Sequence, residues 1–323
     1  MMGGPSPEFD VSLKSGSHVM ERLDPERYEV RGVFIDREGN WDTPPKKLAK
    51  ETDCAFVALH GVYGEDGTVQ SILERHNIPY TGSRMLSSAL AMNKFLALQA
   101  LADHDVRIPV TLFIPRAEWR ASSEITLTTI GERVGYPAII KPNRSGSSIG
   151  VSIARNREEA GEALGHLFHS SDEALVQEFV RGREFTCGVV DRGWPESAFA
   201  LFPTEIFHRD DVWGYHAKYS PETIEMTPPK NLDEHRISEM QKIARRAHEK
   251  LGASGCSRTD IIMSAKGALY YLETNTIPGF TRESLLPKAA EASGVPFEKV
   301  LDMLVDGAAH HERLRASRPS DRA

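Results

Sequence analysis

Two short apolar segments near the C-terminal end carry polar side chains at alternate positions, and this pattern restricts the fold more than any other feature. In "SRTDIIM" (257–263) Arg258 and Asp260 lie two residues apart, and in "ALYYLETN" (268–275) Glu273 and Asn275 do the same. Side chains two apart share one face of a strand, and the intervening "SAKG" is a turn signal. The sequence therefore predicts an antiparallel hairpin with these four side chains on one face.

A hairpin with its loop at 264–267 places Asp260 opposite Tyr271, on the face that carries Glu273. Carboxylate and amide oxygens are ligands of hard cations, and Mg²⁺ is usually held by few protein oxygens together with phosphates. Asp260, Glu273 and Asn275 are thus candidate metal ligands. From the residues alone, a solvated ladder of charges with Arg258 paired to Asp260 explains the pattern equally well.

A second candidate site is the loop in "KPNRSGSSIGV" (141–151), which joins two predicted strands. Glycines allow the backbone amides around Ser147 and Ser148 to fold over an anion, and Lys141 adds a positive charge. The pattern differs from a P-loop, in which the lysine follows the last glycine and a helix comes next. An ordinary flexible hairpin tip is the alternative. Lys94, in the helical segment "AMNKFLALQ", is a further candidate cation, and a solvated surface lysine is its alternative.

Strands and helices alternate along the chain, which indicates an α/β composition. Strands are expected at 28–36, 54–61, 110–115, 136–142 and 150–154, with a strand-rich part after 174–180, and helices are expected at 68–77, 87–103, 156–168 and 235–252. The polar segment that ends the chain has no apolar period and is expected to be disordered.

Composition narrows the function classes. A chain of 323 residues is long enough for two or three domains. Its 46 acidic and 39 basic residues give a net charge of −7, which argues against a nucleic-acid partner. No apolar run approaches the roughly 18 residues of a membrane span. The three scattered cysteines, Cys54, Cys187 and Cys256, indicate a reducing cytoplasm and structural rather than nucleophilic roles.

Eight motifs in one order give a specific resemblance. They are "GGPSPEFDVSLKSG", "ALHGVYGEDGTVQ", "PYTGS", "KPNRSGSSIGV", "EFTCGVV", "HAKYS", "GCSRTDIIM" and "YLETNTIPGFTRESLLP", spread over about residues 3–305. Together they resemble the D-alanine–D-alanine ligases of the ATP-grasp superfamily. The resemblance implies a three-domain ATP-grasp fold: a Rossmann-like N-terminal domain (1–86), a central subdomain (87–177), a C-terminal subdomain with the metal site (178–308) and a tail (309–323).

The resemblance also implies an activity. Such a chain would be a cytoplasmic homodimeric enzyme of peptidoglycan precursor synthesis. It would use ATP and two Mg²⁺ ions, which Mn²⁺ can replace, to join two D-alanine molecules, and it would bind neither nucleic acid nor membrane.

Individual roles follow from the matched motifs. The ATP phosphates would be held by Lys94, Lys141 and Ser148, the adenine by Gln177, Glu178 and Val180, and the ribose by Glu184. The metal ions would be bound by Asp260, Glu273 and Asn275. The two substrates would meet Glu8, His60, Lys218, Ser284 and Leu285. Arg258 and the Gly279 N–H would stabilise the oxyanion, while Ser147 and Tyr219 would close the site.

The chain departs from the common family form at Phe9, Gln177–Glu178, Ile277, Phe280 and Glu283. Glu283 adjoins the position for the second substrate and adds negative charge there. Two other readings stay open: a ligase of the same fold with D-lactate, D-serine or another acceptor, and a nucleotide-binding relic without turnover. Only Met1 and Met2 precede "GGPS", where similar chains begin with an apolar strand. We therefore expect a largely missing first strand and a native start upstream of Met1.

Overall fold

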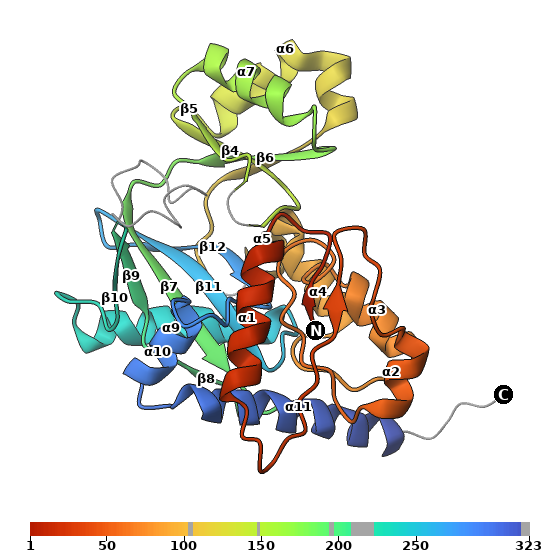
Figure 1. Ribbon diagram of the computed structural model, residues 1–323. Helices are drawn as coiled ribbons and strands as arrows, with labels where there is room; N and C mark the ends of the chain where they lie inside the picture. Colours follow the sequence, from red (N-terminus) through yellow and green to blue (C-terminus); the bar gives the residue numbers. More distant parts are fainter. Residues whose placement is uncertain (103–105, 147–148, 194–196, 208–222, 318–323) are drawn as a thin grey trace.

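The computed structural model describes residues 1–102, 106–146, 149–193, 197–207 and 223–317, with 310–317 described for the backbone only (Figure 1). Within these residues the chain forms three β-sheets with helices packed around them. This mixture of helices and sheets agrees with the predicted fold class. The domain limits at residues 86, 177 and 308 stay a prediction.

The N-terminal part contains the smallest sheet. Its elements are β1 (Met2–Gly3), α1 (Phe9–Arg22), β2 (Phe34–Ile35), α2 (Pro45–Glu51), α3 (Thr68–Arg75) and α4 (Met85–Met92). β1 and β2 pair in parallel. The strand predicted over 28–36 is thus reduced to two residues. The strand predicted over 54–61 is reduced to one bridge between Ala55 and Tyr80.

Segment 54–61 is nevertheless buried, as its apolar sequence predicted, with Val57, Ala58 and Leu59 at most 2% exposed. Its backbone bonds are too sparse for a ladder, since Ala58 N donates to Met1 O while Ala55 N donates to Pro79 O. A regular strand needs a neighbour of matching length, and the two-residue β1 does not provide one. The segment therefore runs through the core without becoming a strand.

The helix predicted over 87–103 is two helices, α4 and α5 (Lys94–Ala102), bent by 96° relative to each other. Asn93 stands at the break, and its Oδ1 accepts hydrogen bonds from Leu96 N (3.0 Å) and Asn143 Nδ2 (3.1 Å). Such a side chain competes with the helical backbone bonds and starts a new helix. The bend makes Lys94 the first residue of α5. Among the described residues, no single helix has the length and apolar character to cross a membrane. α4 and α5 pass that test only as a bent pair.

The central part is a four-stranded antiparallel sheet in the order β3–β6–β4–β5. Its elements are β3 (Thr111–Pro115), α6 (Arg116–Arg133), β4 (Ala138–Pro142), β5 (Ser152–Ala154), α7 (Arg157–Leu167) and β6 (Glu173–Glu178). Figure 1 shows α6 and α7 together on the outer side of this sheet, at the top of the molecule. Ile130, Ile140, Leu164 and Val176 are fully buried between the helices and the sheet.

The third sheet has six strands, in the order β10–β9–β7–β11–β12 with β8 beside β7. They are β7 (Gly182–Val190), β8 (Phe199–Ala200), β9 (Thr204–Phe207), β10 (Ile224–Met226), β11 (Cys256–Ser264) and β12 (Leu269–Asn275). The helices of this part are α9 (Glu234–Lys250), α10 (Leu285–Ala292) and α11 (Phe297–Ser317). α9 packs on the sheet through Met240, Ala244 and Ala247, which are fully buried.

The C-terminal helix α11 includes residues 309–317, which the sequence predicted to be disordered. Ala, Leu, Glu and Arg dominate the segment "AHHERLRA", and these residue types have high intrinsic helix propensity. A helix already packed at its start, where Val300, Leu301 and Leu304 are buried, extends easily through such a segment.

Candidate active site

β11 and β12 pair as the predicted antiparallel hairpin, but the predicted register is wrong. Arg258 lies opposite Asn275, and Asp260 lies opposite Glu273 rather than Tyr271. The partner of Asp260 is thus two residues further along β12 than predicted. One residue comes from the turn, which is longer than predicted because Met263 pairs with Leu269, and the other comes from a β-bulge after Asp260.

The bulge determines which side chains reach the site. Directly opposed residues of an antiparallel pair share a face, so Tyr271 lies on the face of Ile261, and Glu273 on the face of Asp260. Tyr271 is fully buried in the core against α5 and α9. The expectation that Tyr271 shares the face of Glu273 is therefore wrong. An extra residue re-aims the strand, and Glu273 turns to the opposite face.

A cleft of about 230 Å³ opens between this hairpin, the N-terminal part and α10. Most of the predicted site residues that the structure describes meet there. The polar and charged lining includes Glu8, His60, Glu65, Lys94, Ser145, Glu225, Arg258, Glu273, Asn275, Thr281, Glu283 and Ser284. Gly279 and Leu285 also line it.

Lys94 is not a solvated surface lysine, since it is only 8% exposed. Its Nζ donates to Ser145 O (2.6 Å) and lies 3.5 Å from Glu273 Oε2. Its position results from the bend at Asn93, which directs the first turn of α5 toward the loop after β4. Lys141, on β4, is also buried and belongs to the strand that leads into this loop. Lys94 therefore places a positive charge near the Glu273 carboxylate of the hairpin, while Lys141 lies on the strand that precedes the loop.

Arg258 and Asp260 form a bidentate ion pair, with Nε–Oδ1 and Nη2–Oδ2 distances of 3.0 and 3.1 Å. Burial alone would lower the pKa of Arg258, but the adjacent Asp260 carboxylate and its hydrogen bonds raise it, and Arg258 stays charged. The sequence alternative, a solvated ladder of charges, also expected Arg258 to pair with Asp260, and this pairing is present. The pair is not solvated, however, because both side chains are at most 14% exposed.

The hairpin offers oxygen ligands of the type that Mg²⁺ prefers. Among the described residues there is no group of three His, Cys, Asp or Glu side chains arranged for a metal ion. The candidate set has two carboxylates and one amide, because Asp260 and Glu273 are opposed on the hairpin and Asn275 follows on the same face. Asn275 Oδ1 accepts from Ile277 N (2.8 Å), which fixes its orientation. Such a set suits an ion that takes its other ligands from phosphate and water.

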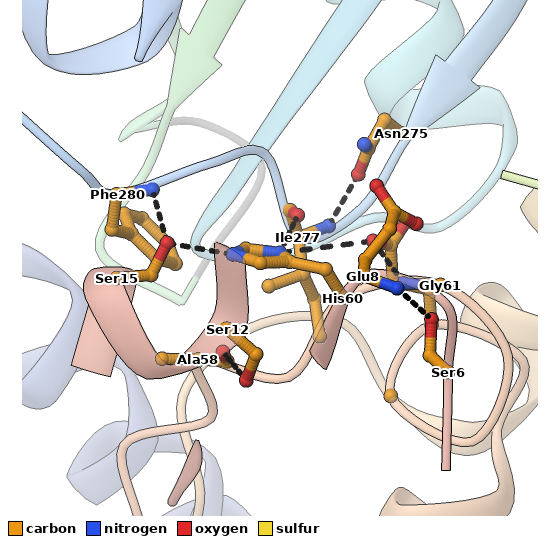
Figure 2. Close-up of polar contacts among 12 residues, drawn as sticks. Ser6, Glu8, Ser12, Ser15, Ala58, His60, Gly61, Asn275, Ile277 and Phe280 are labelled. Atoms are coloured by element: carbon orange, nitrogen blue, oxygen red, sulfur yellow. Dashed lines mark hydrogen bonds and ion pairs between the residues drawn. The ribbon is translucent and has the colours of Figure 1, made fainter. Parts of the chain in front are cut away.

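The other end of the cleft is organised around His60 (Figure 2). Its Nδ1 lies 3.0 Å from Ile277 O and its Nε2 lies 2.8 Å from Ser15 Oγ, which also accepts from Phe280 N (3.2 Å). Because a carbonyl oxygen can only accept, Nδ1 carries the proton. Burial lowers the pKa of His60, although the nearby Glu8 opposes this shift. His60 is therefore a neutral imidazole that joins α1 to the 277–280 segment.

Glu8 stands just before α1, and its backbone N donates to Ser6 Oγ (3.0 Å). Two glycines approach its carboxylate closely. A Cβ atom at Gly61 or at Gly146 would lie 2.7 Å from Glu8 Oε2. Gly146 belongs to the glycine–serine loop, so this loop reaches across the cleft to Glu8.

Ser284 is the residue that precedes α10, and its Oγ accepts from Thr281 N (3.1 Å) and contacts Thr281 Oγ1 (2.7 Å). A Cβ atom at Gly279 would lie 2.5 Å from Ser284 Oγ, so only glycine allows this close packing. The start of α10 thus faces the cleft with Leu285 and Ser284, and the positive end of a helix dipole favours an anion there.

The residues predicted for adenine and ribose lie outside the lining of this cleft. Gln177 is buried on β6 and donates to Thr111 Oγ1 (2.8 Å), Glu178 Oε2 accepts from Val110 N (3.3 Å), and Val180 is 8% exposed. Glu184 lies on β7. β6 pairs with β4, so Gln177 and Glu178 lie in the same sheet as Lys141, whereas Glu184 belongs to the six-stranded sheet. Ser147, Ser148, Lys218 and Tyr219 fall outside the described residues.

Comparison with known proteins decides the family. Residues 101–306 match the family described as "D-ala D-ala ligase C-terminus", and residues 1–51 and 42–83 match "D-ala D-ala ligase N-terminus". This chain belongs to the D-alanine–D-alanine ligase family. The matches cover most of the sequence, as the eight motifs predicted.

Individual relatives of this family agree. The chain is 37% identical to a D-alanine–D-alanine ligase of Geotalea uraniireducens, over 96% of this chain and 94% of the relative. It is 38% identical to that of Geobacter sulfurreducens, over 94% and 92%.

Solved structures show the same ATP-grasp fold. The D-alanine–D-alanine ligase of Coxiella burnetii superposes with a TM-score of 0.84 at 28% identity, covering 98% of this chain and 94% of that one. The D-Ala:D-Ser ligase of Enterococcus faecalis gives 0.84 at 28% identity, covering 95% and 97%. The ligase of Bacillus anthracis complexed with ATP gives 0.79 at 30%, covering 97% of each chain.

Glu65, which lines the cleft of this ligase-family chain, and Ser15, which contacts His60, were not predicted from the sequence. Glu65 is 7% exposed, accepts from Gly61 N (2.9 Å) and lies 3.9 Å from His60 Nδ1. Burial, together with the charge of Glu8, raises the pKa of Glu65 well above its usual range. Ser15 holds His60. Glu65 lies in the polar loop "GVYGEDG", which follows the predicted strand 54–61 at the kind of strand end where ligands gather in α/β sheets. The sequence thus indicated the loop but not this residue, and Ser15 gave no signal of its own.

Proposed function

We propose that this chain is an ATP-dependent ligase that joins two molecules of D-alanine into D-alanyl-D-alanine, releasing ADP and phosphate, for peptidoglycan precursor synthesis. The observation that carries the proposal is the convergence in one cleft of Lys94, Arg258, Glu273 and Asn275 with Glu8, His60 and Ser284. Cations and oxygen ligands stand at one end, and groups suited to an amino acid stand at the other.

The first step is transfer of the γ-phosphoryl group of ATP to the carboxylate of one D-alanine. Lys94 and Lys141 would bind the phosphates, and Gln177, Glu178, Val180 and Glu184 would bind the nucleoside. Asp260, Glu273 and Asn275 would hold Mg²⁺, or Mn²⁺ in its place, which when bound neutralises phosphate charge. Glu8 would pair with the ammonium group of this D-alanine, and the neutral His60 would lie beside it.

The second step is attack by the amine of the other D-alanine on the resulting D-alanyl phosphate. A C–N bond forms, phosphate leaves, and the ammonium proton passes to solvent. Arg258 and the Gly279 N–H would stabilise the oxyanion, since fixed donors aimed at developing charge lower the barrier. Ser284 and Leu285, at the positive end of α10, would hold the carboxylate of this second D-alanine. The glycine–serine loop at Gly146 would exclude water.

The test is release of ADP that depends on D-alanine and Mg²⁺, with the product identified by mass. Lys141→Ala should reduce this release strongly while leaving the fold intact. Background ADP release by the unaltered protein would reject the proposal and favour a nucleotide-binding protein without turnover.

A related ligase with a different acceptor is the second candidate, because one similar structure is a D-Ala:D-Ser ligase. D-Alanine should therefore be offered alone and with an excess of D-serine or D-lactate. A mixed product formed in preference to D-alanyl-D-alanine would overturn the choice of acceptor. The homodimer and the cytoplasmic location implied by the family are part of the proposal, and light scattering of the purified protein tests the dimer.

A further inference from the structure

Three buried side chains behind the cleft form a continuous hydrogen-bonded chain that the proposed reaction does not use. His248 Nε2 lies 2.7 Å from Asp191 Oδ2, and His248 Nδ1 lies 2.8 Å from Ser257 Oγ. Asp191 and His248 are each 1% exposed and Ser257 is fully buried. These are the residue types of a hydrolytic triad, but no substrate can reach the hydroxyl, so a nucleophilic role is excluded.

The network clamps the beginning of β11. Asp191 directly follows β7, and its carboxylate also accepts from the backbone N of Gly193 and of Gly255, the latter at 2.9 Å. The Asp191 backbone N donates to Gly255 O (2.8 Å). Because the carboxylate oxygen of Asp191 accepts, the Nε2–H of His248 donates to it. Asp191 thus fixes both the loop before β11 and the orientation of the His248 ring.

The network reaches β11 at the residue next to Arg258. Successive residues of a strand point to opposite faces, so Ser257 points toward α9 while Arg258 points into the cleft. On the other side of Arg258, Thr259 Oγ1 contacts Thr274 Oγ1 (3.0 Å) and ties β11 to β12. Ser257 instead ties the strand to α9 through His248. The backbone at Arg258 is therefore held both within the sheet and from the helix behind it.

We propose that Asp191, His248 and Ser257 are positioning residues for Arg258, fixing the strand so that the guanidinium meets the developing oxyanion. The inference rests on the proposed function, in which Arg258 acts on that oxyanion. Small displacements of a reacting group have large effects on rate, because catalytic groups need near-ideal geometry.

The first experiment removes one hydroxyl, with Ser257→Ala. We expect kcat for D-alanyl-D-alanine formation to fall about 10-fold, in the range for a slightly misplaced group. The KM for ATP should stay within about two-fold, because an interaction used only in the transition state affects kcat and not ground-state binding. His248→Gln is the second variant. It keeps a donor toward Asp191 but removes the acceptor that faces Ser257, and it should lower kcat similarly.

The second experiment is a double-mutant cycle with Arg258→Lys, which keeps the charge but loses the bidentate geometry. If the network acts through Arg258, adding Ser257→Ala to Arg258→Lys should reduce kcat by less than about two-fold, because effects of coupled residues are not additive. Leu164→Ala is the matched control, since Leu164 is fully buried in the central part, far from β11. It should lower Tm without changing kcat well below Tm.

The outcomes separate the two proposals. An unaltered protein with no D-alanine-dependent ADP release rejects the proposed function, and the inference with it. An active protein in which Ser257→Ala and His248→Gln lower Tm but leave kcat unchanged rejects the inference alone. Full additivity of Ser257→Ala with Arg258→Lys also rejects it, because a general loss of stability would act independently of Arg258. Should Ser257→Ala fail to fold, the same comparisons with His248→Gln decide.

Discussion

The two ends of the cleft are built in opposite ways. At one end, Arg258, Asp260, Glu273 and Asn275 come from a single hairpin, and the turn that joins its strands is short. At the other end, His60 is held by Ile277, which is 217 residues away in sequence, and Ser15 is held by Phe280, which is 265 residues away. One end is local in the sequence, and the other exists only once the N-terminal and C-terminal parts have packed together.

The ends also differ in charge. The hairpin end brings opposite charges together, with Arg258 paired to Asp260, which raises the pKa of Arg258, and Lys94 near Glu273. At the other end, His60 and Glu65 favour their neutral forms beside the charged Glu8, because burial lowers the pKa of His60 and raises that of Glu65. Charged groups suit direct contact with a charged substrate, whereas neutral buried groups act through fixed hydrogen bonds. Substitutions at the hairpin end should therefore remove groups that contact the substrates directly. Substitutions of His60 or its partners should instead disturb the positions of neighbouring groups.

The largest effect should come from Glu273→Gln. The change keeps size but removes a negative charge opposite Asp260, and we expect ADP release to fall about 100-fold or more, because metal-assisted phosphoryl transfer depends on such ligands. ADP release at saturating D-alanine measures the effect. The matched control is Glu132→Gln, at an exposed position of α6, which should leave ADP release unchanged. Equal activity in both variants would show that the hairpin carboxylate is not a ligand.

A smaller effect should follow from Ser15→Ala at the His60 end. The variant leaves His60 Nε2 and Phe280 N without their partner, and an unsatisfied buried group costs about 1–3 kcal/mol. We expect kcat/KM for D-alanine to fall about 10-fold, together with a lower free energy of unfolding measured by urea denaturation. Ser71→Ala, on the surface of α3, is the control. Lost stability with unchanged kcat/KM would limit Ser15 to a structural role.

The sequence predicted the hairpin end well, because its information is local. Period-two alternation placed Arg258 and Asp260 together, and Glu273 and Asn275 together, as the structure has them. The predicted register was wrong because no residue pattern indicates the longer turn or the β-bulge. Each of these two features shifts the pairing by one residue, and together they shift it by two. A shift of two residues keeps side chains on the same face of the sheet, so Asp260 still shares a face with Glu273.

The His60 end was only partly predictable from the residues. The predicted strand 54–61 places His60 and the polar loop that holds Glu65 at a strand end, where ligands gather in α/β sheets. The role of Ser15 depends on a segment far away in the sequence, which contains Phe280. The break at Asn93 was missed for a related reason, since an asparagine within an apolar helical pattern starts a new helix only when a partner such as Asn143 meets it.

The charge difference between the ends predicts a pH effect on stability. Burial lowers the pKa of His60, so below pH 6.5 this side chain binds a proton more readily in the unfolded chain than in the folded chain. The contribution of His60 to stability should therefore fall as pH falls below 6.5, by up to about 1.4 kcal/mol per pH unit. Glu65, whose pKa is raised, contributes with the opposite sign in this range, so the His60 contribution is measured as a difference between proteins. His60→Gln should remove the contribution of His60 from the slope of stability against pH, measured by urea denaturation between pH 7.5 and 5, whereas the exposed His235→Gln should leave the slope unchanged. Parallel slopes in all three proteins would mean that His60 titrates normally.

The smallest predicted effect concerns the acceptor site, the start of α10 where the second D-alanine would bind. There Lys288 Nζ lies 3.0 Å from Glu225 Oε2 and 3.2 Å from Glu283 Oε2. Two carboxylates beside a proposed carboxylate site repel the acceptor unless Lys288 balances them. Lys288→Met should therefore raise the KM for the second D-alanine by about 5-fold, while Glu283→Gln should lower it by about 2-fold, since an exposed charge is screened by solvent. Both shifts should shrink at high salt, and kcat should stay constant. A higher KM in Glu283→Gln would contradict this prediction, because Glu283 would then hold the second D-alanine rather than repel it. The acceptor site would in that case resemble the hairpin end, where charged side chains are proposed to bind charged groups of the substrates.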